Sequence, residues 1–132
     1  MESFEVQTRQ RSDFIDITER VRERLRAKGL RDGACLVYVP HTTAGITINE
    51  DADPDVRRDL QAQLARIAPQ EGLYRHAEGN ADAHVKSSLV GAGQLIPIEG
   101  GELALGRWQG IYLCEFDGPR TRRVYLQWLA GA

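Results

Sequence analysis

The chain has 132 residues, enough for one domain that buries about two-thirds of the surface of its unfolded chain. Its 17 basic and 19 acidic residues give a net charge of −2, which argues against nucleic acid as a partner. No stretch is long and apolar enough to span a membrane, and the acidic N-terminus does not match a signal peptide, so we expect a cytoplasmic protein without a membrane partner.

The N-terminal part of the chain is predicted to contain two strands and a helix. Apolar and polar residues alternate over residues 4–8, and apolar residues return over 14–17, which predicts two short strands. Thr18 is predicted to cap a helix with an apolar residue at every fourth position. Gly29 supplies the left-handed residue that ends it.

Two further strands follow this helix. Residues 34–39 are continuously apolar, which is typical of a strand buried on both faces. Residues 42–49 continue as a β-branched strand interrupted by Gly45, which indicates a bulge or a close backbone approach by a ligand or another chain. Cys35 and Cys114 lie in apolar runs, so we interpret both as small buried residues rather than a disulfide.

Two more helices are predicted in the middle of the chain. Asp53 precedes a proline and an amphipathic segment, which predicts a helix that ends before Pro69. Asp82 is predicted to cap a shorter helix that begins at Ala83 and closes at Gly91.

The C-terminal third is predicted to consist of strands. Residues 94–98 and 103–105 read as two strands joined by a glycine turn. Residues 108–116 and 121–128 are two long alternating runs, and residues 117–120 between them predict a hairpin. Aromatic residues on both faces of these runs indicate packing against helices on one side and another subunit on the other.

Together these elements predict an α+β fold. The chain shows no internal repeat and no linker, so residues 1–132 form a single domain. We expect a large mixed, mostly antiparallel β-sheet and two to three helices.

All three histidines lie in polar segments. His76 and His84 are interleaved with Asn80 and Lys86, and His41 follows an apolar run where polar side chains begin. Three neutral imidazoles are one way to hold a zinc ion with an open position for water. The spacing matches no zinc motif, so the residues alone favour histidines that only make structural hydrogen bonds.

Five motifs follow one another along the chain. They are residues 41–44 (His-Thr-Thr-Ala), 49–51 (Asn-Glu-Asp), His76 with Asn80 and His84, 105–109 (Leu-Gly-Arg-Trp-Gln) and 115–120 (Glu-Phe-Asp-Gly-Pro-Arg). In this order they resemble the YjbQ family over nearly the whole chain. Arg107 departs from the smaller residue, often threonine, that the family leads us to expect before Trp-Gln.

The resemblance implies a small α+β fold, a homotrimer and a histidine-bearing site suited to a divalent metal. Members of the family are often called secondary thiamine-phosphate synthases. The residues implied in the site are catalytic Glu50, Asn49, Lys86 and Asn80, metal-binding His41, His76 and His84, and phosphate-binding Arg120, Thr42 and Thr43.

Three functions remain open on this basis. Weak thiamine-phosphate synthesis would use Mg²⁺ on Glu50 and Asp51, with Lys86 and Arg120 facing phosphates. A hydrolase would use a zinc ion on the histidines with Glu50 as base, and imidazole ligands favour zinc over magnesium. The third is a non-catalytic trimer that binds a small phosphorylated metabolite.

Overall fold

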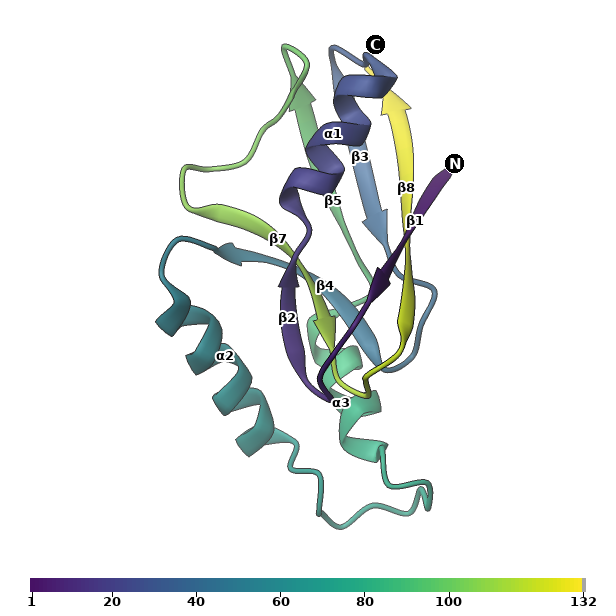
Figure 1. The fold of residues 1–132 in the computed structure, drawn as a ribbon, viewed down its shortest axis with the longest axis vertical. Helices are drawn as coiled ribbons and strands as arrows, with labels where there is room; N and C mark the ends of the chain where they lie inside the picture. The colour runs from purple at the N-terminus through teal and green to yellow at the C-terminus, as the bar shows by residue number, and fades with distance from the viewer. Residues whose placement is uncertain (132) are drawn as a thin grey trace.

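Two antiparallel sheets and three helices make up the fold of residues 1–131, the part of the chain that the computed structural model describes (Figure 1). The helices are α1 (Thr18–Lys28), α2 (Pro54–Ile67) and α3 (Ala81–Val90). The strands are β1 (Glu2–Gln7), β2 (Asp13–Asp16), β3 (Gly33–Tyr38), β4 (Ala44–Glu50), β5 (Gly93–Glu99), β6 (Glu102–Leu103), β7 (Gln109–Glu115) and β8 (Thr121–Ala130). The predicted α+β class is therefore confirmed.

The strands divide between two sheets instead of forming one. The larger sheet has the order β1-β8-β3-β5-β6, and the smaller has the order β2-β7-β4. Every pairing between neighbouring strands is antiparallel. No helix among residues 1–131 combines the length and the apolar character that a membrane crossing needs.

The predicted hairpin over residues 117–120 is wrong, because β7 and β8 belong to different sheets. The backbone of this turn bonds to the link between β1 and β2 instead. Gly118 N donates to Arg11 O at 2.9 Å, and Arg120 O accepts from Thr8 N at 2.9 Å. Arg120 N also donates to Thr8 Oγ1 at 2.9 Å. Both chain segments therefore cross between the sheets side by side.

Aspartate side chains bond to the first residues of the first two helices. In α1 the carboxylate of Asp16 accepts from the backbone N–H and the hydroxyl of Thr18, at 3.0 and 2.5 Å. Thr18 is therefore the first helical residue and not the predicted cap, since its hydroxyl oxygen accepts from Ile111 N on β7 at 2.8 Å. In α2 the predicted cap is confirmed, because Asp53 accepts from Asp55 N at 2.9 Å.

α3 begins earlier than predicted. Asn80 precedes its first turn, so Asp82 lies inside the helix, where it is buried, and is not its cap. The end of α3 explains Gly45 on β4, because a Cβ atom there would lie 2.7 Å from Gly91 O. Ile46 N also donates to that carbonyl at 3.0 Å. The close approach at Gly45 is thus made by the end of α3 of the same chain, and not by the ligand or second chain that the sequence suggested.

One face of the five-stranded sheet is uncovered in a single chain. Cys35 and Val37 on β3 point into the main core and are fully buried. The alternate residues face outward, so the prediction that this strand is buried on both faces is wrong for one chain. The side chains that gather on this outer sheet face are Leu36, Tyr38, Leu95, Tyr125 and Leu129. Leu95 is 61% exposed and Leu129 is 46% exposed.

Helix α2 is only partly buried against the rest of the chain. None of its residues is buried, although Leu60 and Leu64 are partly buried where they pack on the buried cluster that includes Phe14, Tyr112 and Phe116. Figure 1 shows α2 beside the three-stranded sheet, while the two chain ends lie at the opposite end of the molecule from α3.

Candidate functional site

An open pocket of about 560 Å³ lies between α3 and the loop that joins β3 to β4. The loop contributes His41 and Thr42, and α3 and the residues after it contribute His84, Ser87, Ser88, Gly91 and Ala92. We call it the histidine pocket. It brings together two predicted metal ligands and one predicted phosphate-binding residue from segments far apart in the sequence.

The ring nitrogens of His41 have distinct roles. Its Nε2 accepts a hydrogen bond from Arg123 N at 3.0 Å. Burial and then the charge of Arg122 lower the pKa of His41, so the ring is neutral at pH 7. A neutral imidazole has one lone pair and one N–H, so Nδ1 of His41 carries the proton. In this arrangement His41 is a hydrogen-bond donor and has no lone pair left for a metal.

The other two histidines lie next to each other. The ring centroids of His76 and His84 are 5.3 Å apart, and Nε2 of His76 lies 3.8 Å from Oε2 of Glu78. Within residues 1–131, no three His, Cys, Asp or Glu side chains are close enough to share a metal ion. The three histidines therefore do not fit one metal in this arrangement of a single chain, and a metal site stays a prediction.

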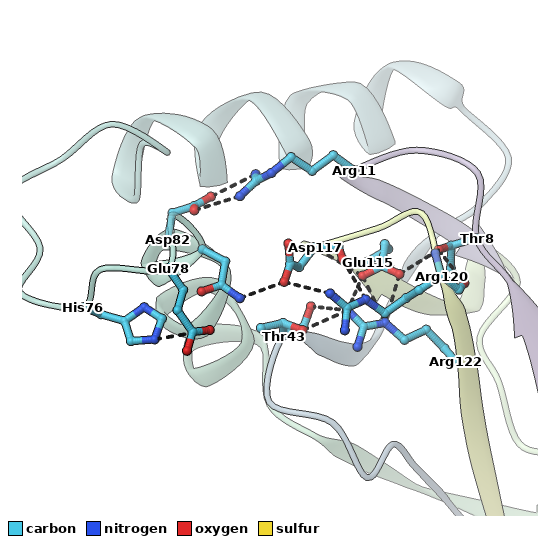
Figure 2. A network of polar contacts seen from close by, with 11 residues as sticks. Thr8, Arg11, Thr43, His76, Glu78, Asp82, Glu115, Asp117, Arg120 and Arg122 are labelled. Carbon is cyan, nitrogen blue, oxygen red and sulfur yellow. Dashed lines mark hydrogen bonds and ion pairs between the residues drawn. The ribbon is translucent and has the colours of Figure 1, made fainter.

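Figure 2 shows a buried ion pair beside Thr43, the residue that follows the pocket residue Thr42. Arg122 and Glu115 are paired with almost no exposed side-chain surface, and Arg122 Nε donates to both carboxylate oxygens, at 2.9 and 3.1 Å. Thr8 Oγ1 donates to the same carboxylate at 2.7 Å. Burial alone would raise the pKa of Glu115, but hydrogen bonds from Arg122, Asp117 N and Thr8 outweigh it and hold the pKa below its usual value.

Thr43 belongs to this buried network. Its hydroxyl and carbonyl oxygens accept from Arg122 Nη2 at 2.9 and 3.0 Å. Of the two threonines predicted to bind phosphate, Thr42 lines the histidine pocket and Thr43 instead positions Arg122.

Lys86 is also engaged within the protein. Its side chain is only 6% exposed, and its Nζ lies 2.8 Å from Oδ2 of Asp82. Arg11 donates to both oxygens of Asp82, at 3.0 and 3.2 Å. Burial would raise the pKa of Asp82, but the bonds and charges of Arg11 and Lys86 lower it. The predicted catalytic lysine therefore neutralises a buried carboxylate.

Asn80 and Arg120 share one acceptor. Asn80 Nδ2 and Arg120 Nη2 both donate to Oδ2 of Asp117, at 2.8 and 3.0 Å. Oδ1 of Asn80 is buried and has no hydrogen-bond partner. Half of the Arg120 side chain remains exposed to solvent, so its guanidinium is available to an anion.

Asn49 and Glu50 lie away from these residues. They end β4, whereas Thr43 immediately precedes its first residue, Ala44. At about 3.3 Å per residue the two ends of this strand are roughly 20 Å apart. Oε2 of Glu50 is buried without a partner, and Oδ1 of Asn49 accepts from Glu50 N at 2.7 Å. One chain therefore does not bring Glu50 to the histidines.

A second polar cluster at this end was missed from the sequence. Burial, and then the bond to Asp16 and its charge, raise the pKa of Asp51. The hydroxyl of Tyr112 donates to Glu50 O at 3.1 Å, and the guanidinium of Arg57 lies 5.1 Å from the Tyr112 ring centroid. The sequence placed Asp16 in one predicted strand and Asp51 just after another. It did not show that β7 pairs with both strands, β2 and β4, and so brings the two aspartates close together.

The buried carboxylates predict how stability depends on pH. Because the folded-state pKa of Asp82 is lowered from 3.8, its contribution is present above that value and is lost as the pH falls through the folded-state pKa. Glu115 acts in the same direction from 4.5. We expect the free energy of unfolding, measured by urea titration, to fall steeply below about pH 4.

Asp82→Asn should lower the free energy of unfolding at pH 7, and this free energy should then fall less steeply below about pH 4 than in the wild type. The matched control is Asp55→Asn on the exposed side of α2, which should reproduce the wild-type curve. If the free energy of unfolding of Asp82→Asn fell as steeply below about pH 4 as that of the wild type, Asp82 would not contribute to the acid sensitivity.

Comparison with known proteins gives a consistent result across sequence and structure. The family described as UPF0047 protein YjbQ-like matches residues 2–131. UPF0047 protein YugU of Bacillus subtilis is 52% identical over 128 residues, which cover 96% of this chain and 97% of that protein. UPF0047 protein MJ1081 of Methanocaldococcus jannaschii is 47% identical over 124 residues, covering 94% of this chain and 90% of that protein.

Solved structures agree with these relatives. An uncharacterized conserved protein of the YjbQ/UPF0047 family from Clostridium acetobutylicum has a TM-score of 0.95 at 50% identity, covering 98% of this chain and 100% of that chain. A hypothetical protein from Aeropyrum pernix has a TM-score of 0.94 at 39% identity, covering 99% and 100%. The reaction therefore has to be argued from the site.

Proposed function

The chain belongs to the UPF0047 protein YjbQ-like family, and we propose that it is a homotrimer that binds a small phosphorylated metabolite in the histidine pocket. The observation that carries the proposal is the set of donors around this pocket. They are the N–H of His41 and the hydroxyl group of Thr42, and His84 adds a second imidazole. The hydroxyl groups of Ser87 and Ser88 also line the pocket, but they donate to Ala44 O and His84 O, at 2.7 and 2.9 Å. Neutral donors and imidazoles on an open surface suit the oxygens of a phosphate.

Weak thiamine-phosphate synthase-type activity is the reaction we propose for this site. Imidazole is the side chain best suited to transfer a proton near neutral pH, which supports an acid–base role for His84. Arg120 supports binding of the phosphates, since its exposed guanidinium is oriented by Asp117. The reaction is expected to be slow, because an open pocket does not exclude water from the reacting groups.

Binding of pyrophosphate, measured by titration calorimetry, tests this proposal. We expect His84→Ala to weaken the affinity at least about tenfold, because each 1.4 kcal/mol of lost interaction is a factor of ten. The control is Gln63→Ala on the exposed side of α2, which should bind as the wild type does. If His84→Ala and wild type bound pyrophosphate equally, the histidine pocket would not be the phosphate site.

The uncovered outer sheet face supports the trimeric assembly. Leu95 and Leu129 on this face are about half exposed, and the rings of Tyr38 and Tyr125 stack there with centroids 6.4 Å apart. Apolar patches of this kind usually mark a protein interface. We expect light scattering to give three times the chain mass of 14.8 kDa.

Leu95→Glu should shift this mass toward the single chain, because the interface would have to bury an unpaired charge. The control, Lys28→Glu on α1, should stay trimeric. Wild-type protein that runs as a stable monomer at micromolar concentration would contradict the assembly.

A zinc-dependent hydrolase is the alternative that the neighbouring rings of His76 and His84 support. Imidazole nitrogens favour zinc over magnesium. The measurement is zinc content by elemental analysis of untagged protein, with His84→Ala as the variant expected to lose the metal. A protein that binds pyrophosphate without zinc and without turnover would be the non-catalytic metabolite-binding trimer.

A further inference from the structure

A second pocket, of about 320 Å³, lies between α1 and the turn that joins β5 to β6. We call it the arginine pocket. Leu25 and Leu103 are its apolar residues, and both are buried members of the main core, so they form its base. Its other lining residues are Arg22 and Arg26 on α1, and Gly101 and Glu102 at the turn. The pocket therefore combines an apolar base with charged side chains, as sites for small polar ligands do.

The arginine pocket is separate from the histidine pocket and from the outer sheet face. Figure 1 shows the C-terminal end of α1 and the tip of β5 at the end of the molecule that holds both chain ends, opposite α3. Helix α1 packs on the inner side of the five-stranded sheet, because its Val21 and Leu25 share one core with Cys35 and Val37. Neither the proposed metabolite site nor the proposed subunit interface therefore uses this pocket.

Three arginine side chains gather at this pocket. Arg22 and Arg26 lie one turn apart on α1, and like charges at this spacing destabilise a helix. Arg31 adds a third guanidinium, since a Cβ atom on Gly101 would lie 3.2 Å from its Nη1. Arg26 also complements the dipole at the end of α1, but this does not account for the other two arginines. An anion in the pocket would offset the repulsion among the three charges.

The chain itself supplies little counter-charge to these arginines. Within residues 1–131, Arg26 and Arg31 form no ion pair, and Arg22 pairs only with Glu19. The side chains of that pair are 42% and 68% exposed, so Arg22 can exchange Glu19 for another anion at little cost. Burial raises the pKa of Asp51, and the charge of Arg22 offsets only part of this rise. All three guanidinium groups thus remain able to bind an anion from outside the chain.

Acidic side chains at the same turn restrict the kind of anion that fits. Glu102 lines the pocket, and Glu99 is its partner across the two strands. Both are exposed, and neither forms an ion pair with an arginine in the part of the chain that the structure describes. Asp32 Oδ1 accepts from Gly100 N at 3.4 Å and so contacts the backbone of the turn. The carboxylate of Glu102 disfavours a bare anion and favours a ligand that also carries hydrogen-bond donors.

We propose that the arginine pocket binds a small phosphate monoester that carries hydroxyl groups. The phosphate accepts from Arg22 and Arg26, whose planar guanidinium groups match its oxygens. It carries about −1.5 to −2 charge at pH 7, which balances two cations, whereas a carboxylate balances one. The carbon skeleton lies on the two leucines, and a hydroxyl group donates to Glu102. The volume of about 320 Å³ is within the range of small-molecule sites, about 300–1,000 Å³.

Methyl NMR spectroscopy of protein with labelled leucine and alanine tests both pockets in one titration. Leu25 and Leu103 report on the arginine pocket, and Ala92 reports on the histidine pocket. The probes are inorganic phosphate, glycerol 3-phosphate and acetate, each added at pH 7 and constant ionic strength. We expect both phosphates to shift the two leucine signals to saturation, glycerol 3-phosphate at the lower concentration, and acetate to leave them in place.

Variants assign the binding to particular side chains. The double variant Arg22→Ala/Arg26→Ala should weaken the binding of both phosphates at least about tenfold. Arg26 is exposed and the Arg22 side chain is 42% exposed, so this variant should keep the fold, which its other leucine signals verify. Lys28→Ala is the matched control, because it removes a cation from the last turn of α1 that does not line the pocket, and it should bind as the wild type does. Glu102→Ala should remove the advantage of glycerol 3-phosphate over inorganic phosphate.

The outcomes separate this inference from the proposed function. Leucine signals that do not move, that move equally with acetate, or that move equally in the double arginine variant would overturn the arginine pocket as a phosphate site. If Ala92 shifted in that same titration, the histidine pocket would stand without it. Saturable shifts of Leu25 and Leu103 that persist in His84→Ala would support the arginine pocket, whether or not Ala92 shifts in the wild type.

Discussion

Arg122→Ala is expected to lower the free energy of unfolding by about 3–5 kcal/mol, because it leaves a buried carboxylate without its counter-charge. Arg122 donates to Glu115 and to both oxygens of Thr43, so one substitution removes five hydrogen bonds from the region between the two sheets. Urea denaturation at pH 7 measures the loss.

The neighbouring arginine provides the matched control. Arg123 pairs with Glu5 at 3.2 Å, but both side chains are about half exposed, so Arg123→Ala should cost less than about 1 kcal/mol. Equal losses in the two variants would show that burial of the Arg122–Glu115 pair is not what makes it important. Arg122→Ala is also compared with the wild type between pH 3 and pH 7. A loss of unfolding free energy that is small at pH 3 and grows toward pH 7 would show that Glu115 is protonated in the folded variant, which avoids the unpaired charge.

Gly33→Ala should lower the free energy of unfolding by a similar amount, because there is no room for a Cβ atom at this position. Gly33 has φ of +147°, and a Cβ atom there would fall on Leu129 O of the neighbouring strand β8 and lie 2.9 Å from Gly131 N. The strained backbone costs about 1–3 kcal/mol. Displacing the strand costs about 1–3 kcal/mol more. Thermal and urea unfolding measure the sum.

Gly100→Ala separates the two costs. Gly100 also has a positive φ, of +61°, but a Cβ atom there would have no neighbour within 4 Å. The variant therefore reports only the backbone cost, about 1–2 kcal/mol. If Gly33→Ala were no more destabilising than Gly100→Ala, the contact with β8 would carry no measurable penalty.

Local patterns predicted the elements of the fold well. The cap at Asp53, the helix end at Gly29 and the glycine turn before β6 all depend on a few adjacent residues, and the structure confirms them. The hairpin at residues 117–120 failed because strand pairing depends on distant residues. The bonds from this turn to Thr8 and Arg11 leave no local pattern in the sequence.

The candidate site was predicted only in part, because some of its contacts join residues that are distant in the sequence. The polar segments around His41 and His84 were visible as motifs, and the structure places both residues at one pocket. The internal use of Lys86 had a local signal, since Asp82 lies four residues before it on α3, but Asp82 was predicted to be the helix cap. Thr43 had no such signal, because its partner Arg122 lies on β8. Residue type shows what a side chain is able to bind, whereas the fold determines which groups lie close enough to bind it.

The position of the last strand has a consequence for how the protein folds. β8 lies between β1 and β3, and pairs Glu2 with Leu126, so the two ends of the chain meet within one sheet. A ribosome releases β8 after all the other strands of this sheet, and until then β1 has no partner in this sheet and one edge of β3 stays open. Contacts so distant in sequence make folding slow. We therefore expect the five-stranded sheet to form only after β8 has left the ribosome, with the open edge of β3 as the segment most exposed to aggregation before that moment.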